Sequence, residues 1–189
     1  MSIVSIEEKL LYLRGELADL RRAGGYFSVI GEGSNTPIIM FIGEAPGEKE
    51  AKTGRPFIGR AGKLLDELLE SQGIKREEVY ITSIVKDRPP KNRDPRPEEI
   101  ELYGPLLDEQ IKSMKPSVIA TLGRFSMEYV MKRYGLSEEI KAISDIHGQV
   151  LKSPNGFKLV PLFHPAAAIY NQKLRPVLLD DFKVLKTLI

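Results

Sequence analysis

Three polar segments of the chain hold side chains that could do chemistry. Residues 43–50 form a turn rich in Gly and Pro that carries the carboxylates of Glu44 and Glu50. Residues 86–97 form a basic, proline-rich stretch, and a third segment begins at His164. Taken singly, each has an ordinary structural explanation: a strand-to-helix turn, a solvated connection, and a hydrogen-bonding histidine at a strand end. Their convergence on one edge of one sheet would favour a functional site.

The basic stretch indicates a phosphate-bearing partner. It holds five basic and two acidic residues, a local charge of +3, whereas the whole chain carries only +2. Its four prolines stiffen it, which lowers the entropy cost of holding those charges against a fixed polyanion. A nucleic-acid backbone is such a polyanion, and binding to it weakens as salt increases. Arg88, Lys91 and Arg93 are therefore candidate DNA contacts.

The hydrophobic pattern predicts the elements that position these segments. Short apolar runs predict buried strands over residues 37–43, 79–85, 118–123 and 157–163. Apolar residues at three- and four-residue steps predict helices over 6–20, around 64–69, from about 98 to 114, and over 124–134 and 176–188. This alternation predicts an α/β fold, a three-layer α/β/α sandwich around a mainly parallel four-stranded sheet. Ligands bind beyond the carboxyl ends of such strands, where the polar segments begin.

We expect one domain over residues 1–189, because no repeat or long linker divides the chain. Pro105 lies inside the predicted helix that ends near Met114, and its ring should kink or split that helix.

The composition excludes several classes of protein. Because the chain has no cysteine, it has no disulfide, no thiolate nucleophile and no cysteine-held metal site. His147 and His164 are the only histidines, which excludes a His-rich metal site, and His147 is expected to be structural. No apolar run approaches the ~20 residues that span a bilayer, and the first residues lack a signal-peptide pattern. We expect a cytoplasmic protein with no membrane partner, from a thermophile because Asn and Gln are scarce and charge is high.

Five stretches, in collinear order from about residue 29 to the C-terminus, resemble the family 4 (thermostable-type) uracil-DNA glycosylases. They are Gly43-Glu44-Ala45-Pro46-Gly47, Thr53-Gly54-Arg55-Pro56-Phe57-Ile58-Gly59-Arg60-Ala61-Gly62, Val79-Tyr80-Ile81-Thr82, Lys86-Asp87-Arg88-Pro89-Pro90-Lys91-Asn92-Arg93 and His164-Pro165-Ala166. The resemblance implies an α/β/α fold and a repair enzyme that flips uracil out of DNA, because the glycosidic bond is unreachable inside the stack. Hydrolysis of that bond would leave an abasic site.

The resemblance assigns the residues around the base. Phe57 matches the aromatic that stacks on the flipped base. His164 matches the histidine facing uracil O2, where negative charge grows as the base departs and a preorganised donor stabilises it. Gly43 and Ala45 belong to the motif that lines the base pocket.

The resemblance also assigns residues to water and DNA. Glu44 and Glu50 lie where the family contacts the water and the uracil C5 edge, and Asn92 matches a polar residue near the sugar and water. Ala168 and Ile169 lie in the 167–170 stretch, which corresponds to an apolar loop that wedges into the vacated stack. The implied partner is uracil-containing DNA, single- or double-stranded, bound by a monomer.

The chain departs from the family in its cofactor ligands. The family holds a four-iron cluster on four cysteines, but Asp87 and Tyr103 stand at the third and fourth positions, and the first pair falls near Glu16 and Asp19. We therefore predict no cofactor and no metal, with ordinary packing in place of the cluster.

A second departure concerns the base edge. The family's Asn at the end of the second strand is Ser83 here. The Asn amide offers a donor and an acceptor to uracil together, whereas a serine hydroxyl is shorter and rotates freely. The sequence therefore leaves the rejection of cytosine undecided, with uracil as the first choice and a shifted base preference as the alternative. It also leaves undecided whether Ser83 is only a small polar residue packed against the core.

Three hypotheses remain from the sequence. The first is a monofunctional uracil-DNA glycosylase. The second is a lesion-binding protein of the same fold with altered base preference or little turnover; a covalent form would need a loop histidine, which residues 86–97 lack. The third is a nucleotide-binding domain that uses residues 43–47 as a phosphate cradle, although it lacks the Gly-Lys-Ser/Thr run of a P-loop.

Overall fold

The computed structural model describes residues 26–189, so the predicted helix over 6–20, with Glu16 and Asp19, lies outside the described residues. Within that part of the chain a six-stranded sheet forms the centre. Its four middle strands run parallel in the order β3 (Tyr80–Ser83), β2 (Ile39–Gly43), β4 (Val118–Leu122) and β6 (Lys158–Leu162). The edge strands β1 (Glu32–Gly33) and β5 (Leu151–Lys152) pair antiparallel with β3 and β6.

The predicted α/β class and parallel strands are confirmed, but the predicted number of strands, four, is lower than the six that the sheet contains. The four predicted strands are the four parallel ones, each shorter than expected by one or two residues at one or both ends. The two edge strands have two residues each, which is too short for alternation of apolar and polar residues to show in the sequence.

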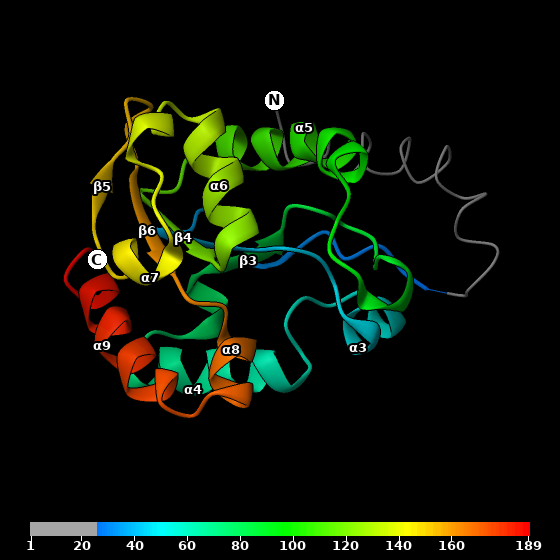
Figure 1. Cartoon of the computed structure of the whole chain (residues 1–189), viewed down its shortest axis with the longest axis horizontal. Helices are drawn as coiled ribbons and strands as arrows, with labels where there is room; N and C mark the ends of the chain where they lie inside the picture. Colours follow the sequence, from blue (N-terminus) through cyan, green and yellow to red (C-terminus); the bar gives the residue numbers. More distant parts are fainter. Residues whose placement is uncertain (1–25) are drawn as a thin grey trace.

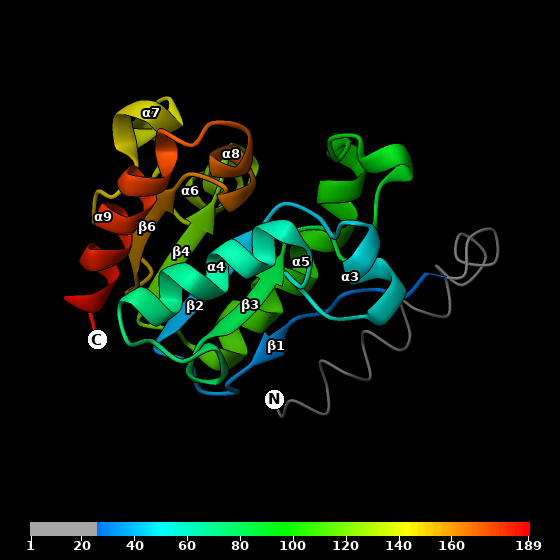
Figure 2. The ribbon, with the colours of Figure 1, turned by 90° about the horizontal axis from the view of Figure 1, so that it is seen from below.

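Helices cover both faces of the sheet and complete three layers (Figures 1 and 2). On one face α4 (Arg60–Ser71), α8 (Pro165–Tyr170) and α9 (Leu174–Lys186) pack on a core that includes Phe41 and Ile81. On the other, α5 (Pro97–Met114) and α6 (Arg124–Arg133) pack on a core that includes Met40 and Ile42. Successive residues of β2 thus serve opposite cores, as they must in a strand buried on both faces.

The shortest helices were not predicted. They are α3 (Glu48–Thr53), α7 (Ile143–Ile146) and α8, together with the 3₁₀ turns η1 (Arg76–Glu78), η2 (Pro90–Asn92) and η3 (Ser137–Glu139). Segments of three to six residues show too little periodicity to be read from sequence.

Of the two effects predicted for Pro105, a kink or a split of its helix, the split does not occur. The helix α5 runs unbroken from Pro97 to Met114 with Pro105 inside it. Both Pro105 and Glu101, the residue whose carbonyl loses its usual donor, are exposed, so water can satisfy the freed carbonyl. Between residues 26 and 189 no helix is long and apolar enough to cross a membrane.

Candidate active site

A cavity of about 530 Å³ opens at the carboxyl ends of the parallel strands, where the three polar segments meet. Glu44, Ala45 and Glu50 line it from the first segment. Asn92 and His164 line it from the second and third. Phe57 and Ser83 also face this cavity, whereas Gly43, predicted to line it, lies behind the Phe57 ring.

Phe57 is held against the end of β2 by two glycines. Its backbone φ is +47°, in the left-handed region that a bulky residue rarely adopts. A Cβ at Gly43 would lie 2.7 Å from the Phe57 ring, and one at Gly62 would lie 1.8 Å from the Phe57 carbonyl oxygen. Glycine at both positions therefore allows the ring to lie at the cavity, 5.7 Å from the His164 ring between centroids. Strained residues of this kind cluster at ligand sites.

His164 is neutral and presents one donor. It is the N-cap of α8, where its Nδ1 accepts a hydrogen bond from the backbone N–H of Ala166 at 3.1 Å. Burial lowers the pKa of His164 to about 4, and the carboxylate of Glu50 offsets only part of that effect. Because Nδ1 is an acceptor, the proton of the neutral ring lies on Nε2. The ring thus has a fixed tautomer whose Nε2–H is available for a ligand.

Glu50 orders the loop that carries Phe57. Its Oε1 accepts hydrogen bonds from the backbone N–H groups of Ile58 at 3.0 Å and Gly59 at 2.8 Å. Gly59 is the N-cap of α4 and offers that helix no side-chain cap, whereas Glu50 binds the backbone N–H groups of this N-cap and of the residue before it. One of its two oxygens is therefore already engaged by the protein.

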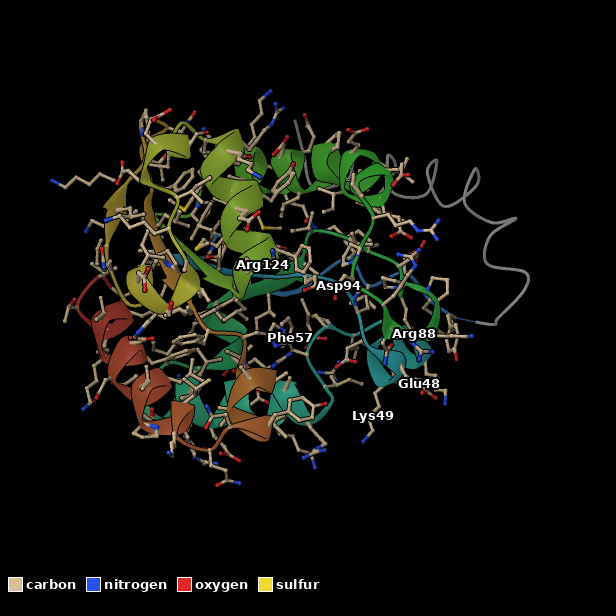
Figure 3. The ribbon with its side chains drawn as sticks, viewed as in Figure 1. Glu48, Lys49, Phe57, Arg88, Asp94 and Arg124 are labelled. Atoms are coloured by element: carbon tan, nitrogen blue, oxygen red, sulfur yellow. The ribbon has the colours of Figure 1, made fainter. Side chains whose placement is uncertain are left out.

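Glu44 is the carboxylate whose ionisation the site alters. It is half-buried just beyond β2, and burial together with the nearby charge of Asp94 raises the pKa of Glu44 to about 7. Arg124, the first residue of α6, acts in the opposite direction. Within the described part of the chain the Glu44 carboxylate has no hydrogen-bonding partner from the protein. In the view of Figure 3 the labelled Asp94 and Arg124 lie above Phe57, and Asp94 lines the cavity.

The sequence analysis missed Asp94 and Arg124. Asp94 stands in a stretch whose excess of basic residues hides it, and Arg124 follows a buried strand as the first residue of a helix, a common surface position. Only the folded chain brings their charges close to Glu44.

Lys86 does not belong to the basic surface to which the sequence analysis assigned it. It is 1% exposed, and its Nζ donates to Thr82 Oγ1 and the Ser83 carbonyl, both at 2.7 Å, and to Gln110 Oε1 at 2.8 Å. Burial lowers the pKa of Lys86 to about 7. Lys86 therefore orders the end of β3 from within the core, and the surface charge of residues 86–97 is lower than the sequence count suggested.

The three predicted DNA contacts differ in their surroundings. Arg88 donates to Asn92 Oδ1 at 2.6 Å and lies 3.6 Å from a Glu48 carboxylate oxygen. Arg88 and Glu48 are labelled in Figure 3. Arg93 forms a two-bond ion pair with Glu99, both bonds at 2.7 Å. Lys91 is exposed, with a left-handed φ of +57°. Arg88 and Arg93 must therefore share their charge with carboxylates before they meet a phosphate.

The predicted wedge, residues 167–170, is divided between the core and the surface. Ala168 is 5% exposed and belongs to the core beneath α8, and Ile169 packs partly against the same core. Tyr170, at the end of α8, is 87% exposed and borders the cavity. Ala168 therefore cannot reach DNA in this structure, because the amphipathic face of α8 turns it inward. Tyr170, two residues after Ala168, is the exposed side chain of this stretch.

Ser83 and His147 have distinct positions. Ser83 is 3% exposed at the end of β3 and lines the cavity, with its Oγ close to Gly43. His147 lies elsewhere, with Nδ1 2.9 Å from the Asp181 carboxylate and its ring 4.7 Å from that of Phe163. These contacts tie the end of α7 to α9 and support the structural interpretation of His147.

Comparison with known proteins identifies the family. Residues 30–184 match the model of the Uracil DNA glycosylase superfamily. The chain belongs to this superfamily. It is 47% identical to a type-4 uracil-DNA glycosylase of Sulfurisphaera tokodaii over 165 residues, which cover 85% of this chain and 74% of that protein. Type-4 enzymes of Archaeoglobus fulgidus and Thermotoga maritima are 44% and 43% identical, over 82% and 85% of this chain and 78% and 82% of theirs.

The described residues do not fit the four-iron cluster that the type-4 resemblance implies. Asp87 and Tyr103, at two of its four ligand positions, offer oxygens and not thiolates, and Tyr103 Oη donates to Asp87 Oδ2 at 2.5 Å. The chain has no cysteine anywhere. Over residues 26–189 no group of three or more His, Asp or Glu side chains could hold a metal ion.

Proposed function

We propose that this protein is a uracil-DNA glycosylase that removes uracil from DNA by hydrolysis and leaves an abasic site. One observation carries the proposal: a stacking aromatic and a neutral histidine lie side by side in a cavity at the strand ends. It is supported by 43–47% identity to type-4 uracil-DNA glycosylases over most of the chain. We further propose that it is a cytoplasmic monomer that acts on single- or double-stranded DNA. In our proposal it is a type-4 variant that carries no iron–sulfur cluster.

The base enters the cavity by leaving the DNA stack. A flipped uracil recovers part of the lost stacking on the face of Phe57, which is already held in place by Gly43 and Gly62. Ala45 and Ser83 lie along the cavity wall, where they would contact the edge of the base. Tyr170 stands exposed beside the opening, and Lys91, Arg88 and Arg93 would meet the phosphates.

His164 stabilises the leaving base. When the bond between the sugar C1′ and the uracil N1 breaks, its electron pair stays on the base and spreads to O2. The Nε2–H of the neutral ring donates to that oxygen without a proton having to be transferred. A preorganised donor in a poorly hydrated cavity stabilises such charge more strongly than water does.

Glu44 is our candidate for positioning the attacking water. Glu50 Oε1 is engaged by two backbone N–H groups and Asn92 Oδ1 by Arg88, so Glu44 offers the least committed acceptor. The water oxygen bonds to C1′ and its proton passes to Glu44 and on to solvent. Glu50 and Asn92 would then hold the loops and the sugar around that water.

An alkali-cleavage assay tests the activity. Single- and double-stranded oligomers with one uracil are incubated with the protein and treated with alkali, which breaks the chain at abasic sites. Strand breaks at the uracil position support the proposal. A retarded band without breaks would support the alternative, a lesion-binding protein with little turnover.

The first prediction concerns His164. His164→Ala should reduce the single-turnover excision rate by about 10²–10³-fold, the usual cost of losing one such donor, with little change in binding to uracil-containing DNA. His147→Ala is the matched control, since that ring contacts Asp181 away from the cavity. Near-wild-type excision by His164→Ala would contradict the assigned role.

The second prediction uses the ionisation of Glu44. Because the carboxylate must be ionised to accept a proton, the excision rate should increase as pH increases through about 7 and then level off. Glu44→Gln should lower the rate and remove this step.

Two neighbouring substitutions provide the control for Glu44. Asp94 raises the pKa of Glu44 and Arg124 lowers it, so Asp94→Asn should move the step to lower pH and Arg124→Gln to higher pH. A step that stays in place in both variants would show that another group titrates.

The third prediction concerns Ser83. If Ser83 reads the base, Ser83→Asn should restore the paired donor and acceptor and raise uracil excision, or its preference over hypoxanthine and xanthine, by up to about tenfold. Crowding could reverse the sign, because Asn is larger in a packed wall. Single-turnover rates of wild type, Ser83→Ala and Ser83→Asn on the three bases decide the matter. Identical rates and base order in all three proteins would show that Ser83 does not read the base.

The fourth prediction is that the protein holds no iron. Protein purified without oxygen should lack the visible absorption of an iron–sulfur cluster, and chelators should not unfold it, because no thiolate is present to bind the metal. Elemental analysis measures this directly, and stoichiometric iron would overturn it.

A further inference from the structure

Asp87 joins three separate segments of the chain. Its Oδ1 accepts a hydrogen bond from Ser28 Oγ at 2.5 Å, and its Oδ2 accepts one from Tyr103 Oη at 2.5 Å. Ser28 precedes β1, Asp87 follows β3, and Tyr103 lies in the second turn of α5. We call these three side chains the Asp87 clamp. Both oxygens of one carboxylate are thus used to connect segments that are distant in sequence.

The clamp lies in apolar surroundings. Tyr103 is 5% exposed and packs with Val85 and Leu106, against Ile30 and Ala45. The backbone reinforces it, since Val29 N–H donates to the Lys86 carbonyl at 2.7 Å. Hydrogen bonds to a charged acceptor are about twice as strong as neutral ones, and poor hydration strengthens them further.

The clamp fixes the point where the loop over the cavity begins. Lys86 is anchored in the core through Thr82, Ser83 and Gln110, and Asp87 is anchored by the clamp. The next residue, Arg88, donates to Asn92 Oδ1 at 2.6 Å, and Asn92 and Asp94 line the cavity. The position of Asp87 therefore sets the position of the loop side chains that face the site.

We propose that Asp87 and Tyr103 are positioning residues for excision, which act by holding residues 88–94 over the cavity through the Asp87 clamp. The catalytic part of this inference rests on the proposed function, whereas the holding of the loop does not. The two residues stand where the type-4 resemblance places two ligands of the iron–sulfur cluster. Hydrogen bonds between side-chain oxygens therefore join the chain segments here, in place of the cluster.

Tyr103→Phe is the sharpest test, because it removes one hydroxyl and keeps the buried ring. Its matched control is Tyr134→Phe, in which the lost hydroxyl donates to Asp108 at 2.7 Å, a Tyr–Asp pair that does not border this cavity. Both variants should lower Tm by a few degrees. Amide hydrogen exchange at Asn92 and Arg93, whose N–H groups donate to the carbonyls of Pro89 and Pro90, should become at least tenfold faster in Tyr103→Phe and stay unchanged in Tyr134→Phe. Unchanged exchange in Tyr103→Phe would overturn the clamp, whatever the activity of the protein.

Excision provides the second measurement. At a temperature where all variants are folded, Tyr103→Phe and Asp87→Asn should each lower the single-turnover rate by about 5- to 30-fold, and the double variant should lose no more than the larger single loss. Tyr134→Phe should stay within twofold of wild type. Full excision by Tyr103→Phe despite faster exchange would overturn the positioning role. A wild-type protein without excision would instead refute the proposed function, and the exchange result would still decide the clamp.

Discussion

The parallel register of β2 with β3 places the whole site. Gly43 pairs with Ser83 at the last step of the ladder, and the pairing continues beyond it, because Val85 N–H donates to the Glu44 carbonyl at 3.0 Å. The first two polar segments therefore leave the sheet side by side. The pairing of β4 with β6 brings the third to the same edge, since Gly123 N–H donates to the Leu162 carbonyl just before His164. Segments 120 residues apart in sequence meet because parallel strands end at one edge.

Backbone N–H groups then fix the orientation of the polar side chains. Two of them hold Glu50, and one sets the tautomer of His164. Two of these donors lie at the N-cap of α4 and at the residue before it, and the third lies in the first turn of α8, where backbone N–H groups have no partner within the helix. Side chains that line the cavity thus satisfy backbone donors at the start of both helices. Stability and preorganisation arise from the same hydrogen bonds.

The sequence predicted the parts of this structure that depend on patterns along the chain. Apolar runs identified the four parallel strands, and the strand ends identified the segments that carry Glu44, Asn92 and His164. Phe57 came from the family resemblance, and all four residues line one cavity. The prediction failed where burial is decided by distant contacts. Lys86 is enclosed by Thr82 and Gln110, whereas its basic neighbours are not. The residue types of a basic, proline-rich stretch do not reveal this difference. Nor does an apolar stretch show which of its residues faces outward, and so Ala168 was placed on the surface where Tyr170 lies.

Burial of two side chains explains much of the electrostatics of the site. Burial lowers the pKa of His164 to about 4 and raises the pKa of Glu44 to about 7, so both shifts favour the uncharged forms. Near neutral pH the cavity therefore carries a neutral imidazole and a carboxylic group close to its titration point. A charged imidazole would cost more to bury than its attraction to the departing uracil anion returns. A neutral donor avoids this cost, and it stabilises negative charge only when that charge appears.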